Sequence, residues 1–307
     1  MKHSIKITLL LLAMFFIAQL VGLVVNSVYA PANIQAVNST GQQVNLTSYN
    51  FPYGIEPPPN EPQFNFISVI VSFALGIAII FLIMWLRAET ILRWWFFAVI
   101  ILGLAISLTA LLQYLPNSSW VALVLAVVLA YVKVFKRDIL AHNFTEILVY
   151  PGISAIFVSL FNILFISLFL IIISFYDMYA VWYSGFMQKM ARYQMKKVRV
   201  FAGFFVPYIG SKERKLLEKF RSMKSKSSKK IKVQVAILGG GDIIFPMILA
   251  GIVLNSFGII PALIVIAGAT SALGYLFYTS EKGKFYPAMP FISVGCFLAL
   301  ALVYLLF

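Results

Sequence analysis

Long runs of apolar residues, separated by short polar segments, dominate the chain. About 20 apolar residues in a helix are enough to cross the roughly 30 Å of hydrocarbon in a bilayer. Runs of this kind predict nine transmembrane helices, at residues 5–26, 66–86, 94–115, 120–134, 144–160, 163–183, 233–254, 257–278 and 287–307. The fifth and sixth runs meet at Phe161-Asn162, where we expect a turn. The pattern therefore predicts an all-α polytopic membrane protein.

The composition excludes a soluble fold. Of the 307 residues 62% are hydrophobic and only 11% are charged, whereas soluble domains are typically about 45–50% apolar and about 25% charged. The interior of a soluble domain of this length is too small to hide so much apolar surface.

The basic residues fix the expected orientation. With the N-terminus in the cytoplasm and the C-terminus outside, all 24 Lys and Arg residues fall in inside segments, as the positive-inside rule requires. The loop 184–232 alone holds 15 of them, which favours attraction to anionic lipid headgroups over binding of nucleic acid. We expect a multi-pass protein of the cell membrane with this loop in the cytoplasm.

Three regions follow from this topology. Residues 1–183 form the first six helices, with an outside loop at 27–65, and residues 233–307 form the last three. The basic loop 184–232 joins the two parts, and its apolar stretch 200–209 is suited to lie on the membrane or dip into it.

Two short signals have weaker interpretations. Val28-Tyr29-Ala30 resembles a signal-peptide cleavage site, but the preceding apolar run is too long and Pro31 disfavours cleavage, so we expect a retained helix. Asn143-Phe144-Thr145 matches a glycosylation sequon but falls on the inside, which indicates a chance occurrence.

Cysteine and histidine are too scarce for several chemistries. The single cysteine, Cys296, excludes an internal disulfide framework and a Cys-based zinc site. The two histidines, His3 and His142, do not form the HExxH pair of a metallopeptidase. We therefore expect no metal and no cofactor.

Two aspartates interrupt predicted helices. Asp177 lies in the sixth helix and Asp242 in the seventh, and the other acids lie in loops or at helix ends. A charged aspartate at mid-membrane costs about 2.5–3.5 kcal/mol even on a lenient scale, so such residues usually face the bundle interior or a water-filled cavity. Both lie roughly 9–14 Å from the expected cytoplasmic surface at 1.5 Å per residue. Two acids at one depth on sequential antiparallel helices can face each other.

Paired carboxyl groups in a low-dielectric site have a specific chemistry. They cannot both ionise readily, so the pair shares a proton. The ionised member takes a proton from an attacking water, and the protonated member donates to a peptide carbonyl, as in aspartic proteases.

Glycines and prolines accompany the aspartates. Three successive glycines, Gly239-Gly240-Gly241, cost about 1 kcal/mol each inside a helix, so we expect them to allow a close backbone approach beside Asp242. Simple helix packing through small residues is the alternative. Pro287-Ala288-Met289-Pro290 removes two backbone donors and is suited to shaping a cavity, although prolines are also common at helix starts.

These motifs together resemble a known family. Tyr176-Asp177, Gly239-Gly240-Gly241-Asp242 and Pro287-Ala288-Met289-Pro290 resemble the YD, GxGD and PAL signatures of presenilins and signal peptide peptidases, with Met289 in place of the usual Leu. Nine spans with the motifs on the sixth, seventh and ninth are similar to a presenilin homologue of the compact microbial, archaeal type. The cytoplasmic position of the 6–7 loop resembles the presenilin branch.

The resemblance implies an intramembrane aspartyl protease. Asp177 and Asp242 would be catalytic, and the substrate-binding or site-shaping residues would be Tyr176, Gly239, Gly241, Pro287, Ala288, Met289 and Pro290. Substrates would be single-span transmembrane helices with their N-termini outside, unwound locally and paired as a strand with enzyme backbone at 287–290 and at the start of the loop or at 233–238. We expect no obligatory partner subunit and leave a homo-oligomer open.

Other functions use similar residues. An ion or proton-coupled transporter, or a leak channel, would also hold paired aspartates, although we find no inverted repeat. A prepilin-type peptidase would have Lys where this chain has Ile244. A non-catalytic scaffold would tolerate loss of both aspartates.

Overall fold

The computed structural model describes most of the chain. The described residues are 5–37, 43–55, 88–136, 138–183, 202–208, 234–281 and 286–307, together with short pieces between 67 and 86. The helices are α1 (Ile5–Val28), η1 (Pro52–Gly54), α3 (Glu89–Leu111), α4 (Ser118–Tyr131), η2 (Val132–Lys136), α5 (Ile139–Leu160), α6 (Ile163–Trp182), α9 (Gly240–Phe257), α10 (Ile259–Thr279) and α11 (Met289–Leu306). Two antiparallel hairpins pair β1 (Ala32–Val37) with β2 (Gln43–Ser48), and β3 (Gly203–Tyr208) with β4 (Gln234–Gly239).

The chain is a multi-pass membrane protein. Within the described residues, eight helices are long and apolar enough to cross a bilayer. They match eight of the predicted spans. The second predicted span, 66–86, lies largely outside the described residues, so the count of nine and the orientation of the termini stay predictions.

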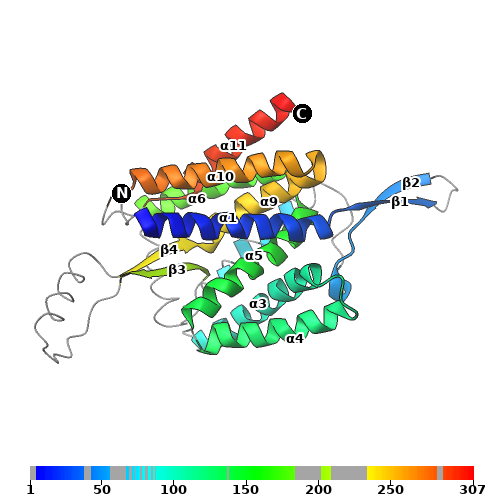
Figure 1. Cartoon of the computed structure of the whole chain (residues 1–307), viewed down its shortest axis with the longest axis horizontal. Coiled ribbons are helices and arrows are strands. Elements are labelled where there is room, and N and C mark those ends of the chain that lie inside the picture. Colours follow the sequence, from blue (N-terminus) through cyan, green and yellow to red (C-terminus); the bar gives the residue numbers. More distant parts are fainter. Residues whose placement is uncertain are drawn as a thin grey trace, which may run out of the picture.

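The helices form one bundle, in which α1 packs on α5, α9 and α10 (Figure 1). In this view α10 and α11 lie above α1, α3 and α4 lie below it, and α5 and α9 cross behind. The largest apolar core joins α1, α5, α6, α9, α10 and α11, with fully buried side chains such as Phe15, Ile166 and Leu249. Small residues bring helices together: a Cβ on Gly295 would lie 2.5 Å from the Gly268 carbonyl oxygen, so α10 and α11 touch backbone to backbone there.

Side chains start two of the helices. Asn162 follows the turn after α5, and its Oδ1 accepts a 2.8 Å hydrogen bond from the Phe165 N–H, which confirms the turn predicted at Phe161-Asn162. Asp138 caps α5 in the same way through the Leu140 N–H at 2.8 Å. This cap starts α5 at Ile139, five residues before the predicted start, because the polar pair His142-Asn143 interrupts the apolar run there.

The expectation of an all-α chain is wrong for two short segments. The hairpin β1–β2 lies in the loop 27–65, and β3–β4 lies at the opposite end of the bundle (Figure 1). Within the apolar stretch 200–209, residues 203–208 form β3, whose Phe204 and Val206 are buried against the helices. Its described part packs on the protein through these two side chains, and its position relative to the membrane stays a prediction.

The predicted start of the seventh helix at residue 233 is also wrong. Residues 234–239 form β4, and α9 begins at Gly240. Along β4, Val235 and Ile237 are exposed whereas Ala236 and Leu238 are buried, which is the two-residue alternation of a strand. A continuous apolar run does not reveal this alternation, because both faces carry apolar side chains.

Candidate active site

Asp177 lies on the inward face of α6. The buried residues of this helix follow one stripe and are Ile166, Phe169, Leu170, Asp177 and Ala180. The Asp177 side chain is only 2% exposed, and its Oδ2 accepts a 3.0 Å hydrogen bond from the backbone N–H of Met289 at the start of α11. Its Oδ1 is buried and has no hydrogen-bond partner among the described residues. One carboxylate oxygen is thus held by the protein and the other remains available for chemistry.

A second polar contact aligns α6 with α11. The hydroxyl of Ser174, one turn before Asp177, lies 2.9 Å from the hydroxyl of Ser293, one turn after Met289. Two polar contacts spaced by one turn fix the sliding and rotation of two otherwise apolar helices. The sequence prediction missed both serines, although their spacing from Asp177 and Met289 places them on the same helix faces.

Asp242 lies at the junction between a strand and a helix. It is the third residue of α9, so its predicted position about nine residues inside a helix is wrong. The cap residue Gly239 has the extended backbone of β4, with φ −67° and ψ 147°. A Cβ on Gly239 would lie 3.2 Å from Asp242 Oδ2, so the missing side chain leaves room for the carboxyl group.

The bundle brings the two aspartates together. Helices α6 and α9 pack against each other, and the carboxyl groups of Asp177 and Asp242 lie close enough to interact electrostatically. The rings of Phe169 and Phe245, with centroids 5.6 Å apart, pack across the same interface. Two carboxyl groups held by different helices can share one proton and act together on one peptide bond and its attacking water as acid and base.

The middle glycine of the motif has the tightest surroundings. A Cβ on Gly240 would lie 2.6 Å from the hydroxyl oxygen of Tyr150, a buried residue of α5, whereas one on Gly241 would lie 3.4 Å from the Phe245 ring. The start of α9 therefore presses directly on Tyr150. The sequence analysis expected a close approach at all three glycines but counted only Gly239 and Gly241 as site residues. It missed Tyr150, because a contact between distant helices leaves no local pattern.

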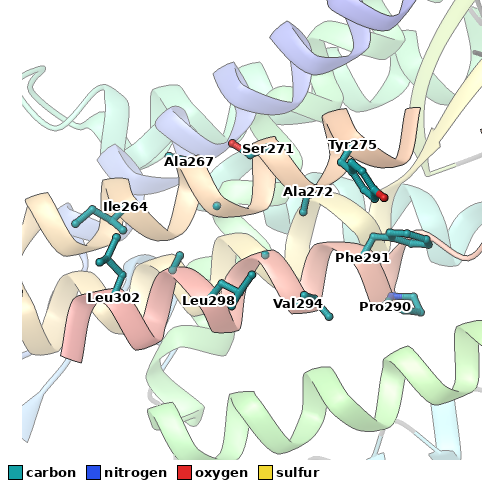
Figure 2. A pocket seen from close by; sticks show the side chains of 13 residues that line it. Ile264, Ala267, Ser271, Ala272, Tyr275, Pro290, Phe291, Val294, Leu298 and Leu302 are labelled. Carbon is teal, nitrogen blue, oxygen red and sulfur yellow. The ribbon is translucent and has the colours of Figure 1, made fainter. Parts of the chain in front are cut away.

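The residues of the segment 287–290 lie in two different environments. Pro287 and Met289 are buried, and Met289 contacts Asp177 through its N–H. Ala288 and Pro290 are half-buried, and Pro290 lines an apolar groove of about 760 Å³ between α10 and α11 (Figure 2). Neither aspartate lines this groove. The structure thus places Met289 at the aspartates and Pro290 on the other side of α11.

Tyr176 is less buried than Asp177 but lies close enough to it to interact electrostatically. Its side chain is 47% exposed on the outer surface of α6, as are those of Phe175 and Tyr179. Tyr176 directly precedes Asp177 in the sequence, but successive helical residues point about 100° apart, so its side chain is more exposed than that of Asp177. In the described part of the chain, no three His, Cys, Asp or Glu residues form a cluster that would hold a metal ion.

Side chains of α5 hold the outer edge of β3. The Phe205 N–H donates to Asn143 Oδ1 at 2.9 Å, and its carbonyl accepts from Asn143 Nδ2 at 2.7 Å. His142 Nε2 lies 2.8 Å from the Gly203 carbonyl oxygen. Since Phe205 directs both backbone groups away from β4, its partner Ile237 directs its own away from β3. The hairpin therefore has one edge held by α5, and its other edge belongs to β4.

Comparison with solved structures reveals a shared fold. The chain is similar to two crystal structures of a presenilin family intramembrane aspartate protease. One has a TM-score of 0.58 at 16% sequence identity and covers 98% of this chain and 99% of the other. The second has a TM-score of 0.56 at 15% identity and covers 97% of each chain. No family model and no curated protein matches the sequence. The resemblance inferred from the motifs is confirmed at the level of the fold.

Proposed function

We propose that this chain is an intramembrane aspartic endopeptidase of the GxGD type. One observation carries the proposal: Asp177 from α6 and Asp242 from α9 come together inside a multi-pass bundle that has the fold of a presenilin family protease. Asp177 is buried among apolar helices, where an acid without a function costs stability.

The pair hydrolyses a peptide bond by dividing acid and base work. The ionised carboxylate removes a proton from a water as the water oxygen attacks the scissile carbonyl carbon. The protonated carboxyl group donates to the carbonyl oxygen, and the amide nitrogen gains a proton as the C–N bond breaks. The Met289 N–H keeps Asp177 in position through Oδ2, which leaves Oδ1 for substrate or water.

The substrate is an extended segment of a transmembrane helix. A helical amide is protected by its own hydrogen bonds, so the enzyme must unwind a short stretch and satisfy the freed groups. The outward backbone groups of Val235 and Ile237 on β4 offer a strand edge for this purpose. Because β4 runs directly into α9, a strand added there leads toward Asp242.

The charge pattern supports an orientation. The basic loop 184–232 lies in the cytoplasm under the positive-inside rule, which places both aspartates nearer the cytoplasmic face of the cell membrane. Substrates then run with their N-termini outside. The substrates are transmembrane helical proteins in the lipid bilayer. The activity needs neither nucleic acid nor an obligatory partner subunit, and it is compatible with a homo-oligomer.

Reporter cleavage in liposomes tests the proposal. Wild type and the variants Asp177→Asn and Asp242→Asn are reconstituted with a single-span reporter, with and without a transition-state-mimicking aspartic protease inhibitor. We expect fragments cut within the span from wild type alone, with rates in both variants reduced by at least about 10³-fold. Asp138→Asn makes the same chemical change at the cap of α5, where Asn caps equally well, and should cleave normally.

Two results would contradict the protease. Equal cleavage by wild type and both variants would remove the aspartates from the chemistry. If folded wild type cuts none of several reporters while its liposomes leak ions through an Asp177-dependent path, the chain is a channel or transporter.

A further inference from the structure

His142 and Asn143, in the first turns of α5, hold the β3–β4 hairpin that leads to Asp242. Asn143 bonds both the N–H and the carbonyl of Phe205, as the backbone of a neighbouring strand would. Next to it, His142 bonds the Gly203 carbonyl through Nε2 and packs its ring 4.9 Å from that of Phe205. The sequon at Asn143 therefore has a structural use for its amide, which is engaged with β3.

A buried ion pair lies next to these contacts between α5 and β3. Lys133 of η2 lies 2.5 Å from Glu146 Oε1, and the two side chains are only 3% and 1% exposed. The same Oε1 lies 3.5 Å from His142 Nε2. Glu146 thus ties the end of the α4–η2 segment to the start of α5 and orients the imidazole toward β3. Charged groups buried this deeply need such partners, since one alone costs several kcal/mol.

Backbone pairing links the contacts between α5 and β3 to the start of α9, where Asp242 lies. Gly203 lies opposite Gly239, and the Gly240 N–H donates to the Ala202 carbonyl at 3.2 Å. Seven residues after Asn143 on the same helix, Tyr150 packs against Gly240. One rigid helix, α5, therefore contacts β3 and the first residue of α9, two positions before Asp242.

We propose that Asn143, assisted by His142, is a positioning residue that sets the register of the β3–β4 hairpin against the aspartates. By occupying the outer edge of β3 it admits a substrate strand only at β4, and it thereby fixes which peptide bond reaches Asp242. A shift of one residue along a strand turns every side chain to the other face, so register decides the cleavage position. This inference rests on the proposed protease function.

The position of the cut tests the inference. Products of a single-span reporter are mapped by mass spectrometry for wild type, Asn143→Ala and Asn143→Asp. We expect wild type to cut at one main position, and both variants to spread their cuts over neighbouring bonds with KM raised about tenfold and kcat within about threefold. Asn143→Asp has nearly the same shape but loses the donor to the Phe205 carbonyl, so a role in packing alone predicts wild-type products from this variant.

A control and a measurement without proteolysis complete the design. Asn162→Asp keeps its acceptor role at the α6 cap and should leave the cut unchanged. Amide hydrogen exchange in liposomes should be faster at 203–208 and 234–239 in both Asn143 variants, with the rest of the bundle unaltered. Unchanged exchange and an unchanged cut in both variants would overturn the inference. An inactive wild type with variant-specific exchange would instead overturn the protease function alone.

Discussion

The two aspartates are held by different kinds of structure. Asp177 lies within a continuous helix, is 2% exposed and receives an N–H from the start of α11. Asp242 lies in the first turn of α9, is half-buried and depends on the strand and glycine that precede it. One carboxyl group is therefore positioned by helix packing and the other by a hairpin. Substitutions on the α6–α11 side should change activity little while the backbone N–H persists, whereas those on the hairpin side should change it strongly.

Among substitutions that leave both aspartates in place, the largest effect is expected at Gly240. Gly240→Ala places a Cβ 2.6 Å from the hydroxyl of the buried Tyr150, so the Tyr150 ring or the start of α9 must move. We expect about 10²-fold lower kcat/KM, as for an approximately 1 Å displacement of a catalytic group, together with about 1–3 kcal/mol of lost stability. Reporter kinetics and thermal unfolding measure the two effects.

A matched glycine provides the control for Gly240. In α10, a Cβ on Gly274 would make ordinary contact at 3.6 Å with Leu12, so Gly274→Ala should retain activity and gain slightly in stability. Adding Tyr150→Phe to Gly240→Ala removes the nearest atom and should restore part of the rate. Wild-type kinetics for Gly240→Ala alone would show that the junction does not position Asp242.

A smaller effect is expected on the open strand edge. Ile237→Pro removes one N–H that points away from β3, and proline is tolerated on an edge strand. Losing one hydrogen bond to substrate should raise KM about tenfold with little change in the melting temperature. Leu238→Pro, which removes an N–H that points toward β3, should instead lower the melting temperature. If Ile237→Pro alters stability and leaves KM unchanged, the outer edge of β4 does not bind substrate.

The smallest effect is expected beside Asp177. Met289→Leu preserves the backbone N–H that Asp177 accepts and replaces one buried side chain with another of similar volume. We expect kcat/KM within about threefold of wild type and a larger change in the affinity of an aspartic protease inhibitor. A loss of activity as large as that of Gly240→Ala would mean that both aspartates depend equally on their surroundings.

Much of the fold follows from local sequence signals. Apolar runs predicted eight of the spans, because the energy of transfer into lipid is a sum over consecutive residues. The meeting point of two apolar runs gave the turn between α5 and α6, where the structure shows Asn162 capping α6. The two aspartates were identified from their energetic cost alone, since a buried acid among apolar helices needs a reason.

The errors concern features that depend on distant contacts. The run 234–239 is apolar on both faces, and only its pairing with β3 makes it a strand. Tyr150 looks like an ordinary core residue until α9 is packed on it. In the sequence Asn143 looks like part of a glycosylation sequon, whereas in the structure its side chain bonds the backbone at the outer edge of β3. Local patterns thus singled out the two aspartates, and tertiary pairing decides how their carboxyl groups are oriented.

The pairing of β3 with β4 also separates the position of Asp242 from the length of the segment between the two strands. Tyr208 lies opposite Gln234, so the two described residues that flank the segment 209–233 are adjacent on one stem. Lengthening a segment closed in this way costs only about 0.6 kcal/mol for each doubling. Insertions and charge changes in this segment can therefore accumulate for membrane affinity or regulation while Asp242 stays in place. The same stem offers engineers an insertion point for a fluorescent or affinity module.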